Sequence, residues 1–268
     1  NEKMWDCARH KTYMCLEYLL ENSSFVEDAK IFLSYFKLKV DKINEIKPDE
    51  LLEPRQYLDI NNDGGFFMNI WKKYIFARSD TGTGKTTAFK NYIKKTNKRF
   101  ISIVSRVSLG KEQVKVFKEA GIDCVFHEEI SEGEWWANEG NNIVVTIDSI
   151  IKMCNWEDFN DYVLYLDEYN SLIEYFVDCP NLSDKRVIVW NQLNRMLLQA
   201  EQTIMTDADI SDNSINFIYG LYEDVKDDCV YIQNKYKHNK DKQATELFSY
   251  DDLIETISKQ DKAMICLD

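Results

Sequence analysis

Proline and glycine are scarce in this sequence, with 3 Pro and 9 Gly among 268 residues. Collagen-like repeats and proline-rich linkers need these residues in large numbers, so both classes are excluded. No run reaches the roughly 18 consecutive apolar residues that a membrane-spanning helix needs. The first residues, Asn-Glu-Lys-Met-Trp-Asp, contain no apolar signal core. The sequence therefore predicts an intracellular protein that does not enter a membrane.

Paired cysteines are also lacking. The 7 Cys are odd in number and form no Cys-x-x-Cys pair, and there are only 3 His. This pattern argues against a disulfide framework and against a cysteine-rich zinc site. A reducing compartment fits it better.

Positive charge is in deficit, since 33 Lys and Arg face 46 Asp and Glu and give a net charge of −13. Such a chain does not coat nucleic acid by bulk charge, although a local basic groove remains compatible with it. We expect DNA binding by this chain alone to be weak and strongly salt-sensitive. The 44% hydrophobic content is that of a normal globular core.

The first 64 residues differ in pattern from the rest of the chain. Their apolar residues recur at helical spacing, which predicts a small helical N-terminal extension. Pro48 and Pro54 bracket a break, and Asp49 and Glu50 are well placed to start a helix there. The turn-rich segment Asn61–Gly65 then predicts a domain boundary.

After Lys73, short apolar runs alternate with helical stretches. The predicted strands are Tyr74–Ala77, Phe100–Val104, Asp123–Phe126, Ile143–Thr146, Val163–Leu166 and Thr203–Met205. The predicted helices are 85–96, 108–120, 147–153, 170–177, 183–199 and 211–220. This alternation is typical of an α/β fold with a parallel sheet covered by helices on both faces.

One further apolar run, Ala263–Leu267, predicts the first strand of a second α/β domain. The sequence is therefore divided into an extension at 1–64, an α/β domain at 65–240 and the start of a truncated second domain at 241–268. A first residue that is Asn instead of Met also suggests a piece of a longer protein.

The segment between the first predicted strand and helix carries the strongest chemical signal. Glycines there let backbone N–H groups turn toward a phosphate, and the helix N-terminus adds its dipole. A lysine then meets the β- and γ-phosphates, and a following threonine hydroxyl ligates Mg²⁺. The segment consists of Ser79, Asp80, Thr81, Gly82, Thr83, Gly84, Lys85, Thr86 and Thr87.

Serine stands at position 79, where the full P-loop pattern has glycine, and helicase-type loops often have a small residue there. The alternative is a chance Gly-Lys-Thr turn. The strand before the segment and the helix after it favour the ATP site.

A pair of acidic residues, Asp167 and Glu168, follows another buried strand. Ligands gather at the carboxyl ends of parallel strands, so Asp167 is placed to hold Mg²⁺ together with Thr86. Glu168 is then placed to orient or deprotonate the attacking water. The alternative is an acidic turn that caps a helix starting at Asn170. With a phosphate loop upstream, the pair favours ATP hydrolysis over phosphoryl transfer to a small molecule, and Lys85, Asp167 and Glu168 are the predicted catalytic residues.

These motifs resemble those of superfamily-2 helicases. Ser79–Thr87 resembles their motif I, Ser105–Leu109 motif Ia and Asp167–Asn170 motif II. Val144–Ile150 is similar to the segment before motif II that touches the nucleic-acid strand, and Thr206–Asp209 takes the place of motif III. The combination of Arg-x-Ser-Leu, Asp-Glu-x-Asn-Ser-Leu and Asp-Ala-Asp is similar to the herpesvirus-type origin-of-replication-binding helicases, some of which follow a primase region.

The resemblance implies a RecA-like P-loop sheet, ATP and Mg²⁺ as cofactors, and ATP-driven movement on single-stranded or forked DNA in replication. It further implies that Arg106, Ser108 and Thr146 contact the sugar-phosphate backbone and that Asp207 couples the nucleotide to DNA grip. Other replication proteins would be partners, no membrane is involved, and an oligomer is compatible with the sequence. If the protein is viral, its compartment is the host cytoplasm or nucleus. In plainer interpretations, Arg106 is a surface charge and Thr146 caps the following helix.

Three alternatives to this hypothesis remain: a restriction-type translocase, an AAA+ ATPase, and a non-catalytic scaffold in which bound nucleotide only locks the conformation. No arginine follows Arg195, so the arginine finger of a second helicase domain is lacking and we expect slow hydrolysis by this chain alone. Arg55-Gln56-Tyr57 lies upstream of the phosphate loop, where in several helicases a glutamine or an aromatic residue reads adenine by hydrogen bonding or stacking.

Overall fold

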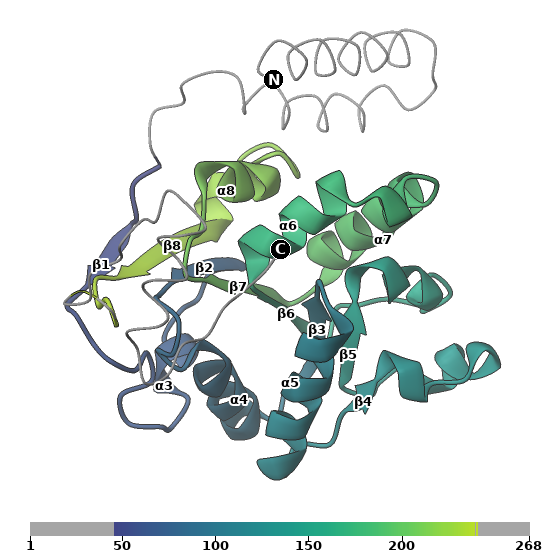
Figure 1. Ribbon diagram of the computed structural model, residues 1–268, viewed down its shortest axis with the longest axis horizontal. Coiled ribbons are helices and arrows are strands. Elements are labelled where there is room, and N and C mark those ends of the chain that lie inside the picture. Colours follow the sequence, from purple (N-terminus) through teal and green to yellow (C-terminus); the bar gives the residue numbers. More distant parts are fainter. Residues whose placement is uncertain (1–45, 239, 241–268) are drawn as a thin grey trace, which may run out of the picture. The chain divides into compact units, whose positions relative to one another are not determined.

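The computed structural model describes residues 46–238 and 240. Their strands form one sheet of eight strands in the order β1-β8-β2-β7-β6-β3-β5-β4, and all neighbouring strands run parallel (Figure 1). The strands are β1 (Glu50–Leu52), β2 (Tyr74–Arg78), β3 (Arg99–Val104), β4 (Val125–Phe126), β5 (Ile143–Thr146), β6 (Tyr162–Asp167), β7 (Gln202–Asp207) and β8 (Cys229–Asn234).

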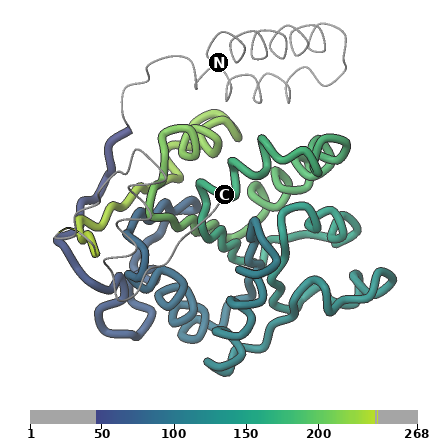
Figure 2. Tube along the Cα trace, in the orientation of Figure 1, coloured from purple at the N-terminus to yellow at the C-terminus, as the bar shows by residue number. Residues whose placement is uncertain are grey.

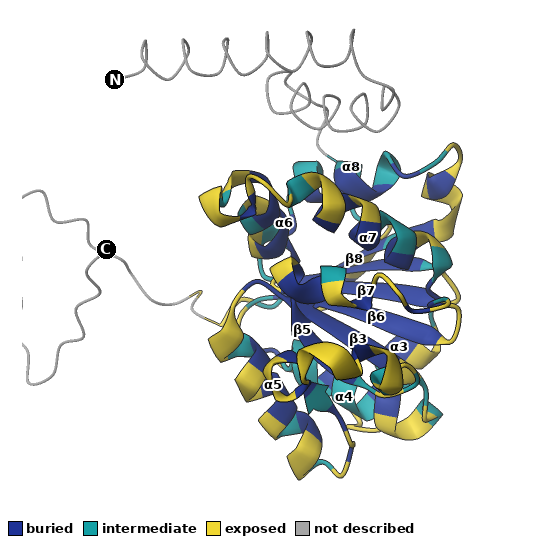
Figure 3. Cartoon of the chain, turned by 90° about the vertical axis from the view of Figure 1, so that its right-hand side faces the viewer, coloured by how far each residue is buried: buried dark blue, intermediate teal, exposed yellow. Residues whose placement is uncertain are grey.

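Helices cover both faces of this sheet. The α-helices are α3 (Gly65–Met68), α4 (Lys85–Thr96), α5 (Val107–Glu119), α6 (Tyr169–Asp178), α7 (Arg186–Gln199) and α8 (Asp212–Tyr219). Short 3₁₀ helices are η1 (His127–Glu129), η2 (Glu132–Asn138), η3 (Ile147–Met153), η4 (Pro180–Leu182) and η5 (Val225–Asp228). Helices α3, α4 and α5 lie on one face, and α6, α7 and α8 lie on the other (Figures 1 and 3).

The strands are buried on both faces, as Figure 3 shows for the centre of the sheet. In β2, Tyr74 and Phe76 point into the core under α6, α7 and α8, whereas Ile75 and Ala77 point into the core under α4 and α5. Alternate side chains of a strand point to opposite faces, so a strand between two helical layers must be apolar throughout. This explains the apolar runs of the sequence.

The strand order brings the motif-bearing segments together. Strands β2, β7, β6 and β3 are consecutive neighbours, and all of them run in the same direction. The register pairs Arg78 with Asp207 and Thr206 with Asp167. The carboxyl ends of these four strands therefore lie together. They carry the phosphate loop, the motif III segment, the acidic pair and the segment after β3, and we call this side of the sheet its carboxyl edge.

The predicted fold class, a RecA-like parallel sheet flanked by helices, is confirmed. All six predicted strands are present, and the predicted helix at 147–153 is a 3₁₀ helix. The helical residues predicted before 46 and the strand predicted at Ala263–Leu267 lie outside the described residues.

Strands β1 and β8 were not predicted from the sequence. Strand β8 enters the sheet between β1 and β2, so the first and last described segments lie side by side (Figure 2). The prediction of a helix start at Asp49 and Glu50 is wrong, because Glu50 begins strand β1. The Asp49 carboxylate accepts the N–H of Tyr231 at 2.8 Å and so supports pairing with β8. The five residues between the two prolines are too few for a helix, but three of them suffice for an edge strand.

Within residues 46–238, no helix is long and apolar enough to cross a bilayer.

The contact between Phe89 of α4 and Tyr165 of β6 holds one helical layer on the sheet. Their rings stack with centroids 4.0 Å apart and planes 5° apart, and both residues are fully buried. Phe89→Ala should lower the free energy of unfolding by about 3–5 kcal/mol because it leaves a cavity. Urea denaturation measures this. The control is Val187→Ala, at an exposed position of α7, with an expected change of about 0.5 kcal/mol or less; equal losses for both variants would contradict the prediction.

Candidate functional site

The phosphate loop connects β2 to α4 and is braced by its own side chains. The Ser79 hydroxyl donates to Thr83 Oγ1 at 2.7 Å, and the Thr83 hydroxyl donates to the Asp80 carbonyl at 2.6 Å. Gly82 and Gly84 have φ of 78° and 72°, which a residue with a Cβ adopts only under strain. The loop is therefore a tight turn that its glycines and its own side chains hold in place.

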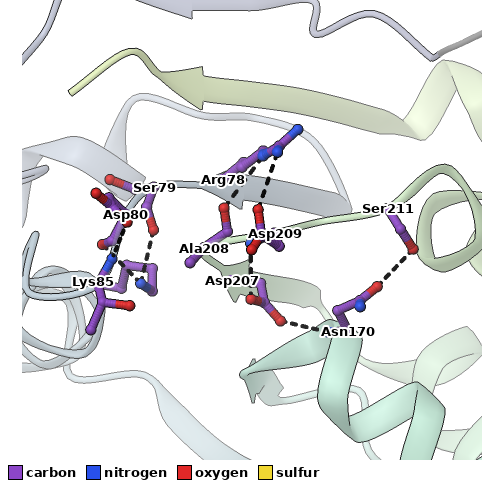
Figure 4. A network of polar contacts seen from close by, with 10 residues as sticks. Arg78, Ser79, Asp80, Lys85, Asn170, Asp207, Ala208, Asp209 and Ser211 are labelled. Carbon is purple, nitrogen blue, oxygen red and sulfur yellow. Dashed lines mark hydrogen bonds and ion pairs between the residues drawn. The ribbon is translucent and has the colours of Figure 1, made fainter. Parts of the chain in front are cut away.

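Lys85 begins α4 directly after this loop. Its amine donates to the carbonyls of Ser79 at 2.9 Å and Asp80 at 3.1 Å, so it lies across the mouth of the loop (Figure 4). Burial lowers the pKa of Lys85, and the carboxylates of Asp167 and Asp207 oppose part of this shift. A partly desolvated cation at this place suits a bound polyanion.

The carboxylate of Asp167 is held by donors on both oxygens. Oδ2 accepts the Thr86 hydroxyl at 3.0 Å and the Gln113 amide at 2.9 Å. Oδ1 accepts the Thr206 hydroxyl at 2.9 Å and the backbone N–H of Glu168 at 3.1 Å. With 5% of Asp167 exposed, these four bonds replace the water that a carboxylate would otherwise bind.

The pair Thr86 and Asp167 fits Mg²⁺. Both supply hard oxygen atoms, and Mg²⁺ in nucleotide sites takes one or two protein ligands together with phosphates and water. Among residues 46–238, no group of three or more His, Cys, Asp or Glu side chains could hold a metal ion. With phosphates and water as the remaining ligands, the oxygens of Thr86 and Asp167 suit a magnesium ion that arrives with a nucleotide.

Glu168 follows Asp167 in the left-handed backbone region, with φ 51° and ψ 50°, and precedes α6. Burial raises the pKa of its carboxyl group, and the carboxylates of Asp167 and Asp207 raise it further, whereas Arg106 and Lys85 oppose the shift. A carboxyl group with a raised pKa is a stronger base when ionised, as a residue that takes a proton from water must be.

Asp207 ties three segments of the site together. Its carboxylate accepts the backbone N–H of Asn170 at 2.7 Å, and its carbonyl accepts the N–H of Ser79 at 2.9 Å (Figure 4). Arg78 forms an ion pair with Asp209 at 3.2 Å. Strand β7 thus contacts the phosphate loop on one side and the start of α6 on the other.

The three other predicted nucleic-acid residues lie beyond β3 and β5. Arg106 and Ser108 are exposed at the start of α5. Thr146 is buried, and its hydroxyl contacts Ser149 Oγ at 3.2 Å and His127 Nε2 at 3.3 Å. Two of the three side chains therefore reach the surface, whereas the Thr146 hydroxyl faces the interior.

A model of the origin of replication binding protein family matches residues 65–241, more than half of the chain. The chain belongs to this family. The match confirms the resemblance to the origin-of-replication-binding helicases that the motifs carry. Among curated proteins, none matches the sequence.

Solved structures with a similar fold include those of three helicase-related proteins. A DEAD box protein from Methanococcus jannaschii has 15% identity and a TM-score of 0.47, with 65% of this chain and 48% of that chain covered. A hypothetical ATP-dependent RNA helicase from Sulfolobus tokodaii has 13% identity, a TM-score of 0.45 and coverage of 76% and 56%. S. cerevisiae Dbp5 bound to RNA and ADP BeF3 has 14% identity, a TM-score of 0.48 and coverage of 78% and 50%. The chain spans about half the length of these proteins.

Two side chains that were not predicted as site residues bind Asp167: Gln113, which lies in none of the motifs, and Thr206, which begins the motif III segment. Tyr57, the aromatic residue of the segment predicted to read adenine, has its ring carbon Cδ1 3.5 Å from where a Cβ on Gly84 would stand. The N–H of Leu58 donates to the Thr83 carbonyl at 3.0 Å, so the segment around Tyr57 lies against the phosphate loop. The role suggested for its exposed neighbour Gln56 stays a prediction.

Asn234, at the end of β8, is another residue that was not predicted from the sequence. Its side-chain oxygen accepts the N–H groups of Arg55 at 3.2 Å and Tyr236 at 3.1 Å. Its amide donates to the Arg55 carbonyl at 2.8 Å and to Ser79 Oγ at 3.0 Å. Only 3% of Asn234 is exposed, so this one side chain joins three segments in the origin-binding-protein domain.

Asn234→Leu should lower the free energy of unfolding by about 2–4 kcal/mol, because it leaves two backbone N–H groups buried without an acceptor. Urea denaturation of both proteins measures the loss. Asn69→Ala is the control, since the Asn69 amide binds the Gly65 carbonyl at an exposed position; it should change stability by about 0.5 kcal/mol or less. If Asn234→Leu costs no more than Asn69→Ala, Asn234 does not brace the loop.

Proposed function

We propose that this member of the origin of replication binding protein family is an ATP-dependent DNA helicase or translocase that acts in replication. Residues 65–240 form its first motor domain, after an extension at 1–64 and before a second α/β domain that begins at 241–268. The observation that carries the proposal is the contact between Thr86 of the phosphate loop and Asp167 at the end of β6. Two segments far apart in sequence meet there with the donors that a magnesium nucleotide needs.

The residues Ser79–Thr87 bind the phosphates of ATP in this proposal. Backbone N–H groups of the loop and the N-terminus of α4 supply neutral donors, and the Lys85 amine moves from loop carbonyls to the β- and γ-phosphates. Thr86 and Asp167 would hold Mg²⁺, which neutralises phosphate charge when it is bound. Tyr57, whose ring lies beside Gly84, would contact the base of the nucleotide in this proposal.

Glu168 serves as the residue that orients or deprotonates the attacking water. Glu168 directly follows β6, on the side of the sheet where the phosphate loop follows β2. The raised pKa of its carboxyl group makes it a better proton acceptor. Water is a weak nucleophile, so a base held at a fixed place contributes directly to the rate.

Arg106 and Ser108 contact the sugar-phosphate backbone of the DNA in this proposal. Both are exposed at the edge that carries the nucleotide site. Thr146 supports this edge from inside through Ser149, and Asp207 connects the phosphate loop to α6. In this proposal a change at the phosphate loop would reach α6 through Asp207 of β7.

Lys85→Ala and Glu168→Gln test the two halves of the ATP site. Lys85→Ala should weaken binding of a nonhydrolysable ATP analogue about 10–100-fold, because one charge-assisted bond to the phosphates is lost. Glu168→Gln should keep this affinity and reduce phosphate release about 10²–10⁴-fold, because a water-activating group is lost. Fluorescence titration and phosphate release with single-stranded DNA measure the two effects.

Lys94→Ala, an exposed lysine later on α4, is the matched control and should change neither quantity. Hydrolysis that survives both site variants would show that Lys85 and Glu168 are not catalytic.

Arg106→Ala should weaken binding to single-stranded DNA and reduce the slope of log affinity against log salt by about 0.7, the value for one phosphate contact. Arg99→Ala is the matched control, because Arg99 begins β3, the strand that precedes Arg106, and so lies at the opposite end of the strands. Anisotropy titrations at several salt concentrations compare the variants. Equal slopes for both would place the DNA elsewhere.

A further inference from the structure

Gln113 is a buried glutamine on α5 that none of the motifs includes. Only 2% of it is exposed, and its side chain extends from the helix to the end of β6. Its amide nitrogen donates to Asp167 Oδ2 at 2.9 Å, the oxygen that also accepts the Thr86 hydroxyl. The amide therefore contacts the side of the carboxylate that faces the phosphate loop.

A second bond fixes which end of the amide faces Asp167. The hydroxyl of Ser102, which is fully buried in β3, donates to Gln113 Oε1 at 2.6 Å. A carboxylate only accepts hydrogen bonds, so the nitrogen of Gln113 must point toward it and the oxygen must point away. Ser102 supplies the donor that this oxygen needs. Ser102 thus donates to Gln113, and Gln113 and Thr86 both donate to Asp167 Oδ2.

We propose that Gln113 is a positioning residue that holds the Asp167 carboxylate toward Thr86, so that the pair receives a magnesium nucleotide without rearrangement. This inference rests on the proposed function, because it assigns a role within the same nucleotide site. The donors on Oδ1, Thr206 and the Glu168 N–H, fix the other oxygen. Without Gln113, Oδ2 loses one of the two side-chain hydrogen bonds that orient it toward the phosphate loop.

Gln113 also joins α5 to the nucleotide site. The exposed Arg106 and Ser108 lie at the beginning of the same helix. The buried amide is thus the contact through which the helix with the proposed DNA contacts meets the proposed magnesium site.

The test is binding of a fluorescent nonhydrolysable ATP analogue to the full chain, with MgCl₂ and with EDTA. The wild-type protein should bind more tightly with Mg²⁺, and the ratio of the two affinities is the magnesium gain. Gln113→Leu should reduce this gain about 10–100-fold, the usual cost of losing a residue that orients a metal ligand, and leave the affinity in EDTA within about two-fold. Ser102→Ala should shift the gain in the same direction by a smaller factor, because the amide loses its fixed orientation.

Gln202→Leu is the matched control. Gln202 is also buried, accepts the Tyr92 hydroxyl at 3.0 Å and donates to the Lys72 carbonyl at 3.0 Å, but it begins β7 at the edge opposite the site. This variant should lower the Tm and keep the full magnesium gain. If Gln113→Leu behaves in the same way, Gln113 only satisfies a buried carboxylate and the inference fails.

Lys85→Ala separates this failure from failure of the proposed function. If Lys85→Ala weakens binding in EDTA but Gln113→Leu keeps the gain, the ATP site stands and only the role of Gln113 is refuted. If Lys85→Ala leaves binding intact, the proposed function itself fails. Should Gln113→Leu not fold, the unbranched Gln113→Met and Ser102→Ala carry the test, and an unchanged gain in both overturns the inference.

Discussion

The buried Asp167 carboxylate needs hydrogen-bond donors, and much of the site's geometry follows from where those donors must lie. A charge with 5% exposure is unfavourable unless hydrogen bonds replace its water, and here the phosphate loop, α5 and β7 each contribute one side-chain donor. Each donor must lie within a few tenths of an ångström of its place, so the carboxylate fixes how these elements meet. In the tightly packed core around it, one misplaced element would leave both a gap and an unpaired charge.

Several carboxylates lie at this same edge of the sheet, and backbone N–H groups donate hydrogen bonds to two of them. Asp207 accepts an N–H from α6, and Asp80 accepts the N–H of His238 at 2.7 Å. This backbone bond is the largest cause of the lowered pKa of Asp80. Glu168 has less of this support, and its pKa is raised. Asp207 and Asp80 are thus held in place by backbone N–H groups, whereas Glu168 has the higher proton affinity that a base needs.

The phosphate loop and the acidic pair were predictable from sequence because their chemistry depends on neighbours in the chain. The glycines, Lys85 and Thr86 follow one another at fixed spacing, and Asp167 follows an apolar strand. Gln113 and Asn234 were not predictable, because an amide within a helix or at a strand end has no signature until its partner is known. Strand β1 was mistaken for a helix start for a similar reason, since only its pairing with β8 determines its conformation. The predicted roles of the site residues and the division into domains stay predictions.

The position of β2 in the sheet has a consequence for synthesis. This strand, which carries the phosphate loop, pairs only with β7 and β8, both of which come much later in the chain. At a ribosomal rate of about 5–20 residues per second, β2 waits on the order of ten seconds for its neighbours. An apolar strand with both edges open for that time attracts other chains. Cells that make this protein must therefore shield β2, by chaperones or by the helices already formed, until β8 leaves the ribosome.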